Sequence, residues 1–102
     1  MYLHELIEEL EKHDPAKKVK RGFDGPHSYR GYYDELAFEP TGETTVGAML
    51  KAARSALGET YQGWKGGDFK MDEWTPCHLA YVGDCGESLG ATLLGYMLAD
   101  EA

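Results

Sequence analysis

The chain is short of cysteine, of basic residues and of long apolar runs, and each shortage excludes a class of protein. Its 102 residues include two cysteines, Cys77 and Cys85, which form no CxxC pair. We therefore expect free thiols in a cytoplasmic protein rather than a disulfide framework. No apolar run approaches the roughly 20 residues of a membrane-spanning helix, and the acidic, amphipathic N-terminal segment is unlike a secretory signal peptide. The sequence predicts no membrane association.

Basic residues are outnumbered by acidic ones, 10 Lys and Arg against 18 Asp and Glu, which gives a net charge of −8. This charge argues against direct binding of nucleic acid, because contacts to phosphates supply most of that affinity. The four histidines are scattered, and no HxH, HExxH or Cys/His set has the spacing of a metal site. The phosphate-binding patterns GxxxxGK[ST] and GxGxxG are also missing. We predict no metal, no cofactor and no catalytic residue.

What the sequence does contain is the pattern of one small folded domain over residues 1–102, with 42% apolar and 12% aromatic residues. Apolar spacing predicts three helices. The first covers residues 2–13, the second runs from an N-cap at Thr44 or Thr45 to a stop at Gly58, and the third covers residues 87–99. Alternation and turn residues predict strands over residues 17–23, 32–38 and 77–82, with a hairpin or ordered loop over 59–76. The order α-β-β-α-(β)-β-α indicates an α+β fold, in which helices pack on a small, mostly antiparallel sheet.

The last predicted helix is apolar on more than one side. Its inward stripe is expected to be Leu89, Leu93, Tyr96 and Met97, and Leu94 and Leu98 widen it. Either this helix is the central core helix, or it meets another subunit and forms a homo-oligomer.

Positive charge is concentrated between residues 16 and 33, where five basic residues accompany a single acid, Asp24. The five are Lys17, Lys18, Lys20, Arg21 and Arg30. One interpretation is a solvated basic strand that pairs with the acidic first helix. The other is a site for an anionic ligand, because an Arg side chain offers a planar fork of donors that matches phosphate or carboxylate.

The segment 27–33 is the strongest candidate for such a site. It places Arg30 among His27, Ser28 and the aromatic residues Tyr29 and Tyr32. Hydroxyl and backbone N–H groups near a glycine can hold a phosphate, and tyrosine rings can stack on a base. The alternative is that the tyrosines are half-buried strand residues and that Arg30 pairs with a neighbouring acid, Asp34 or Glu35. A Ser28–His27–Asp24 triad is disfavoured, because sequence neighbours rarely reach triad geometry.

The segment 63–69 is a second candidate. Lys65 lies between Trp64 and two glycines, so its ammonium could reach an anion while the indole stacks on a base. The alternative is a hairpin turn with an exposed lysine.

Several strings resemble a largely uncharacterised family of small proteins from bacteriophage and prophage genomes. They are HSYRGYYDELAFEP (27–40), TVGAMLKAARSALG (45–58), GWKGGDFKMDEWTP (63–76) and GESLG (86–90). The resemblance covers most of residues 20–95. Because small phage proteins often counter host defence, and some act as sponges for nucleotide signals, it implies an anti-defence role by analogy only.

These observations support three hypotheses. The first is a cytoplasmic, oligomeric, non-enzymatic protein that sequesters a phosphorylated or nucleotide-like immune signal. Its expected ligand-binding residues are Arg21, His27, Ser28, Tyr29, Arg30, Tyr32, Trp64 and Lys65. The second is an acidic inhibitor that mimics DNA and binds a host defence or nucleic-acid enzyme. The third is a small phosphodiester- or nucleotide-processing enzyme in which His27 acts as acid and base.

Overall fold

A four-stranded mixed sheet is the centre of the computed structural model, which describes residues 1–30, 32–63, 65–80 and 86–101. Its strands are β2 (Gly22–Ser28), β3 (Leu36–Thr41), β7 (Cys77–Ala80) and β8 (Gly86–Ser88), in that order across the sheet. The pairs β2–β3 and β7–β8 are antiparallel, while β3–β7 is parallel because the chain crosses over through a helix between them. The predicted α+β class is confirmed.

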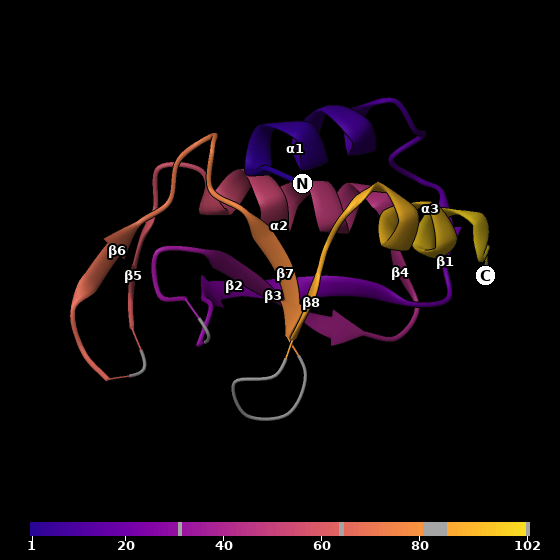
Figure 1. Ribbon diagram of the computed structural model, residues 1–102. Coiled ribbons are helices and arrows are strands. Elements are labelled where there is room, and N and C mark those ends of the chain that lie inside the picture. The colour runs from indigo at the N-terminus through magenta and orange to yellow at the C-terminus, as the bar shows by residue number, and fades with distance from the viewer. Residues whose placement is uncertain (31, 64, 81–85, 102) are drawn as a thin grey trace.

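Two short pairs of strands complete the β structure. β1 (Lys18–Val19) pairs with β4 (Thr44–Thr45), and β5 (Thr60–Gln62) forms a hairpin with β6 (Asp68–Lys70). The β5–β6 hairpin projects from one end of the molecule, away from α3 (Ala91–Ala99), which lies near the opposite end (Figure 1).

Two helices are stacked on one side of the sheet. α2 (Val46–Ala56) contacts β2, and α1 (Leu3–Glu11) contacts α2 (Figure 1). Thr45 is the N-cap of α2, since its Oγ1 accepts a hydrogen bond from the N–H of Ala48 at 3.1 Å. The expected buried stripe of α2 is confirmed at its first four positions, Val46, Met49, Leu50 and Ala53. Leu57 is exposed instead, because the helix ends before it.

The core is filled mainly by aliphatic side chains from these helices around a pair of phenylalanines. Phe23 of β2 and Phe38 of β3 are both buried, with ring centroids 4.5 Å apart. Leu3, Leu6 and Leu10 of α1 are fully buried, which confirms the amphipathic pattern of the first helix. No helix in the described ranges is both long and apolar enough to cross a membrane.

The strand boundaries in the first half of the chain differ from those expected. The Asp24-Gly25-Pro26 segment does not end a strand: β2 runs through it to Ser28, with a register shift between Asp24 and His27. Gly25 has φ +58°, a left-handed conformation that glycine adopts without steric cost, so the strand tolerates the irregularity. In addition, β3 begins at Leu36 rather than Tyr32, because residues 32–35 form a turn. In this turn the Glu35 N–H donates a hydrogen bond to the carbonyl oxygen of Tyr32 at 2.9 Å.

The end of the chain also differs. The last helix begins at Ala91, because residues 86–88 form the edge strand β8. Its buried side chains are Leu94, Met97 and Leu98, and Tyr96 is 73% exposed rather than inward. The expected inward residues Leu89 and Met97 are buried, as are Leu94 and Leu98, so the expected stripe is wrong at Tyr96. The last residues of the strand predicted over 77–82 lie outside the described ranges, as does Cys85.

Candidate functional site

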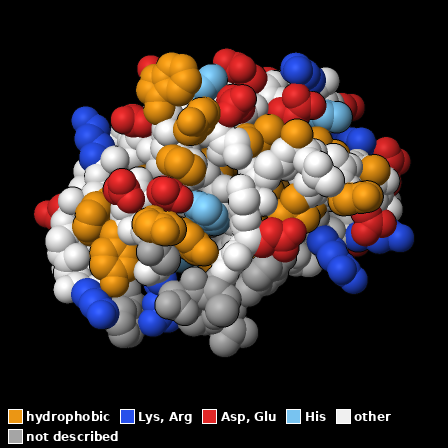
Figure 2. All heavy atoms as spheres, viewed as in Figure 1, with side chains coloured by type: hydrophobic (Ala, Val, Ile, Leu, Met, Phe, Trp, Pro, Cys, Tyr) orange, Lys and Arg blue, Asp and Glu red, His pale blue; other side chains and the backbone are white. Residues whose placement is uncertain are grey.

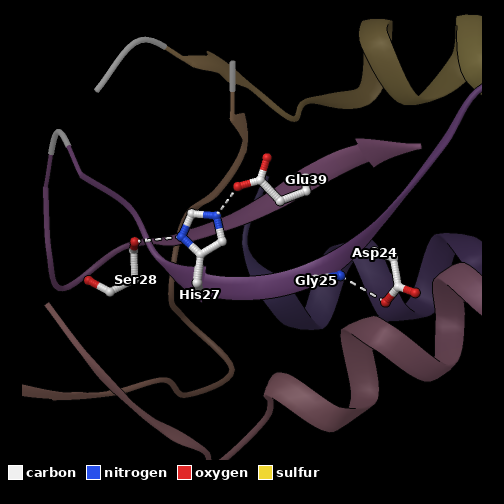
Figure 3. Close-up of polar contacts among 5 residues, drawn as sticks. All are labelled: Asp24, Gly25, His27, Ser28 and Glu39. Carbon is white, nitrogen blue, oxygen red and sulfur yellow. Dashed lines mark hydrogen bonds and ion pairs between the residues drawn. The ribbon is translucent and has the colours of Figure 1, made fainter. Parts of the chain in front are cut away.

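His27, which was expected to contact a ligand, is held by two acceptors within the sheet. Its Nδ1 lies 2.8 Å from the carbonyl oxygen of Ser28, and its Nε2 lies 2.8 Å from Oε1 of Glu39 on β3 (Figure 3). A carbonyl and a carboxylate both accept, so both ring nitrogens can donate only in the imidazolium form. The imidazole therefore belongs to a cross-strand pair between β2 and β3.

Ser28 is also engaged internally. Its side chain is buried, and its Oγ donates to the carbonyl oxygen of Tyr33 at 2.5 Å. Asp24 accepts a hydrogen bond from the Gly25 N–H at 2.8 Å and lies apart from His27 (Figure 3). The three residues therefore do not form a Ser-His-Asp triad, which the sequence analysis had already disfavoured.

Tyr29 takes part in a cluster that the sequence did not predict. Its ring stacks on the imidazole of His78 from β7, with centroids 4.1 Å apart and an interplanar angle of 11°. The Nε2 of His78 donates to Oε1 of Glu35 at 2.6 Å. The ring also lies against β8, since a Cβ added at Gly86 would come within 2.8 Å of a Tyr29 ring carbon. One face of the ring that was expected to stack on a base is thus covered by His78.

Arg30 and Tyr32 follow in the turn after β2. Arg30 is partly buried, and Tyr32 is 67% exposed. The turn lies beside the β5–β6 hairpin, because the rings of Tyr33 and Phe69 are 5.7 Å apart. Lys65 is exposed in that hairpin, next to two glycines with positive φ, whereas Trp64 lies outside the described residues. Segments 27–33 and 63–69 are thus neighbours in space.

Arg21 lies apart from this group. It precedes β2, while Ser28 ends it, so roughly 20 Å of extended chain separates Arg21 from the turn with Arg30. Arg21 lines a cavity of about 290 Å³ whose apolar wall is formed by Leu79, Leu93 and Met97. Within the described part of the chain it forms neither an ion pair nor a side-chain hydrogen bond. The two arginines expected to clamp one phosphate lie at opposite ends of one strand.

Two of the three neighbouring lysines form ion pairs within the described ranges, and these pairs are with acids at the end of the chain rather than with the first helix. Lys17 lies 3.3 Å from Glu101, and Lys20 lies 3.6 Å from Asp100, so the C-terminal acids neutralise part of the basic segment. Within the described residues, no group of three or more His, Cys, Asp and Glu side chains is arranged to hold a metal ion.

Cys77, beside His78 in the sequence, is the first residue of β7, and its side chain is fully buried. Burial raises the pKa of this thiol to about 12, so it stays protonated at neutral pH and is a poor nucleophile. The side chains of Cys77 and His78 lie on opposite faces of β7, as alternation along a strand requires.

We compared the chain with protein-family models, with curated proteins and with solved structures, and none of the three comparisons found a match. The phage-family resemblance therefore stays a prediction.

Proposed function

We propose that this protein binds a small anionic ligand that carries an apolar or flat group, and that the ligand lies in the cavity beside Arg21. The observation that carries the proposal is an arginine without an ion-pair or hydrogen-bond partner among the described residues, in a cavity lined mainly by apolar side chains and by Thr41. The guanidinium would bind a phosphate or carboxylate, and Leu79, Leu93 and Met97 would cover the apolar part.

The size of the cavity limits the ligand. At about 290 Å³ it is at the lower end of the range of small-molecule sites, roughly 300–1,000 Å³. A compact molecule with one ring system and one anionic group fits this class. A nucleotide-like signal is one member of the class, and sequestering it without chemical change is the role that we propose by analogy with phage sponges.

The loop residues enter this proposal differently from Arg21. The polar groups of His27 and Ser28 are already hydrogen-bonded within the protein, and the Tyr29 ring is stacked. Binding a ligand through them would break those interactions first. We therefore assign the ligand to the cavity and propose that the loop supports the sheet beside it.

Our proposal includes a homo-oligomer through α3. Tyr96 is the most exposed large aromatic side chain in the described ranges, and a Cβ added at Gly95 would meet nothing within 4 Å. Both features support a partner at this helix. Since Leu93 and Met97 of α3 also line the cavity, such a partner would lie near the ligand.

Native mass spectrometry would test the ligand and the assembly together. The protein would be measured alone and with nucleoside monophosphates, cyclic dinucleotides and short fatty acids. We expect a defined oligomer that gains one ligand mass per subunit. Arg21→Ala should weaken binding at least tenfold, the usual size of a charge-assisted hydrogen bond. Lys51→Ala is the matched control, because Lys51 is an exposed cation that lines a separate hollow on α2.

Three results would contradict the proposal. Binding that survives Arg21→Ala but is lost in Tyr32→Ala would place the ligand at the loop. Conversion of the ligand to a product would favour the enzyme hypothesis with His27. A monomer that ignores the whole panel would favour the acidic inhibitor.

A further inference from the structure

Three aromatic rings gather on the surface where α1 begins, and none of them lines the cavity at Arg21. Trp74 lies edge-on to His4 at a centroid distance of 4.6 Å and to Tyr2 at 5.8 Å. Trp74 is 60% exposed and Tyr2 is 44% exposed. Figure 2 shows hydrophobic, histidine and acidic side chains side by side over this end of α1. We call Tyr2, His4 and Trp74 the aromatic patch.

The patch is held by backbone hydrogen bonds between two segments far apart in sequence. The N–H groups of Leu3 and His4 donate to the carbonyl oxygens of Thr75 and Glu73, at 2.9 and 3.0 Å. The backbone N–H of Trp74 donates to Oδ1 of Asp72 at 2.8 Å, and this hydrogen bond fixes the turn that carries the indole. Exposed rings fixed in this way lose little further freedom when they bind a partner.

The charged side chains that neighbour the patch in sequence are carboxylates. Glu5, Glu8 and Glu73 are exposed next to the rings in sequence, and segments 1–11 and 71–76 contain no Lys or Arg. Aromatic faces and carboxylates both attract cations, and the face of Trp is the strongest of the natural aromatic faces. The same carboxylates repel nucleic acid and the anionic surface of a membrane.

We propose that the aromatic patch is a docking surface for a basic segment of another protein, which places an Arg or Lys side chain on the Trp74 ring. The surrounding carboxylates would pair with its further cations and orient it. This interaction is separate from ligand binding at the Arg21 cavity and does not depend on it. It gives the acidic surface a specific anchor, since Trp and Tyr are the residues that most often carry binding energy at interfaces.

A capped tetra-arginine peptide is the probe for isothermal titration calorimetry, and a capped tetra-glutamate peptide is its negative control. We expect tetra-arginine to bind and Trp74→Ala to weaken it about fivefold or more, the typical effect of one cation–π contact. Trp74→Phe should retain part of the affinity, because it keeps an aromatic face. Tyr32→Ala is the matched control, since it removes a ring that is 67% exposed and lies outside both the aromatic patch and the proposed contact through α3.

The possible results separate the explanations. If tetra-arginine binds equally to the native chain and to Trp74→Ala, the peptide is attracted only by the net charge of −8, and the proposal is overturned. No binding at all, or an equal loss of affinity in Tyr32→Ala, would overturn it as well. If Trp74→Ala instead changes the sedimentation of the protein alone, the patch binds a second copy. Amide NMR spectra of each variant would show that the fold is retained.

Discussion

The two candidate ligand-binding regions, the turn after β2 and the cavity at Arg21, differ in how far their polar groups already have partners within the protein. In the first, His27 is bound by Glu39, Ser28 by the Tyr33 carbonyl, and Tyr29 lies on His78. In the second, Arg21 has no partner among the described residues and lies beside apolar side chains. Polar groups thus stabilise the fold in one place and leave a charge available for a ligand in the other.

The largest expected effect concerns the packing of Tyr29 on β8. Gly86→Ala would place a methyl group 2.8 Å from a Tyr29 ring carbon and 3.1 Å from the Leu79 carbonyl oxygen. We expect it to lower the free energy of unfolding by about 2 kcal/mol, the usual cost of overpacking. Urea denaturation would measure this loss.

Gly95→Ala is the control for that substitution. Gly95 is in the middle of exposed α3 with open space around its Cα, so alanine should raise the stability by up to about 1 kcal/mol. If Gly86→Ala and Gly95→Ala lower the free energy of unfolding equally, the loss is not specific to the contact between Tyr29 and β8.

The next effect concerns the buried thiol beneath His78. Because burial raises the pKa of Cys77 from 9.0 to about 12, the thiol ionises more readily in the unfolded chain. Its stabilising contribution is therefore complete below pH 9 and is lost as the pH rises from about 9 to 12. At pH 10 the loss should be about 1 kcal/mol.

The comparison of native protein with Cys77→Ala isolates this contribution, because all other titrating groups are shared. Urea denaturation at pH 8 and pH 10 should show a smaller loss of stability in Cys77→Ala. Equal losses in both proteins would mean that Cys77 is accessible to water.

The smallest effects compare one polar residue from each region. Ser28→Ala removes a buried hydroxyl donor and should destabilise the protein by about 1 kcal/mol, because the Tyr33 carbonyl loses its hydrogen bond. Arg21→Ala should change the stability by less than about 0.5 kcal/mol, because its side chain is exposed and has no partner within the described residues. Thermal unfolding of both variants would test this contrast. A larger loss for Arg21→Ala would mean that it serves the fold rather than a ligand.

Local patterns predicted the parts of the fold that depend on neighbouring residues. The leucine spacing of α1, the Thr45 cap and the first four buried positions of α2 were read correctly, because a helix satisfies its hydrogen bonds within itself. The strand limits were less accurate, because the bulge near Gly25 allowed β2 to continue through a sequence typical of a turn. In α3 the expected inward position of Tyr96 was wrong, because several faces of this helix are apolar and its neighbours decided which one is buried.

The sequence by itself determined the α+β class, the amphipathic helices and the separation of acidic from basic segments. Only the tertiary structure decided which polar groups meet. The parallel pairing of β3 with β7 brings Ala37 opposite His78 and so allows Glu35 to reach that histidine, 43 positions away in the chain. The length of β2 places Arg21 far from Arg30, although both are in one basic segment. Strand pairing forms hydrogen bonds between distant residues, so its register depends on the packing of the whole sheet.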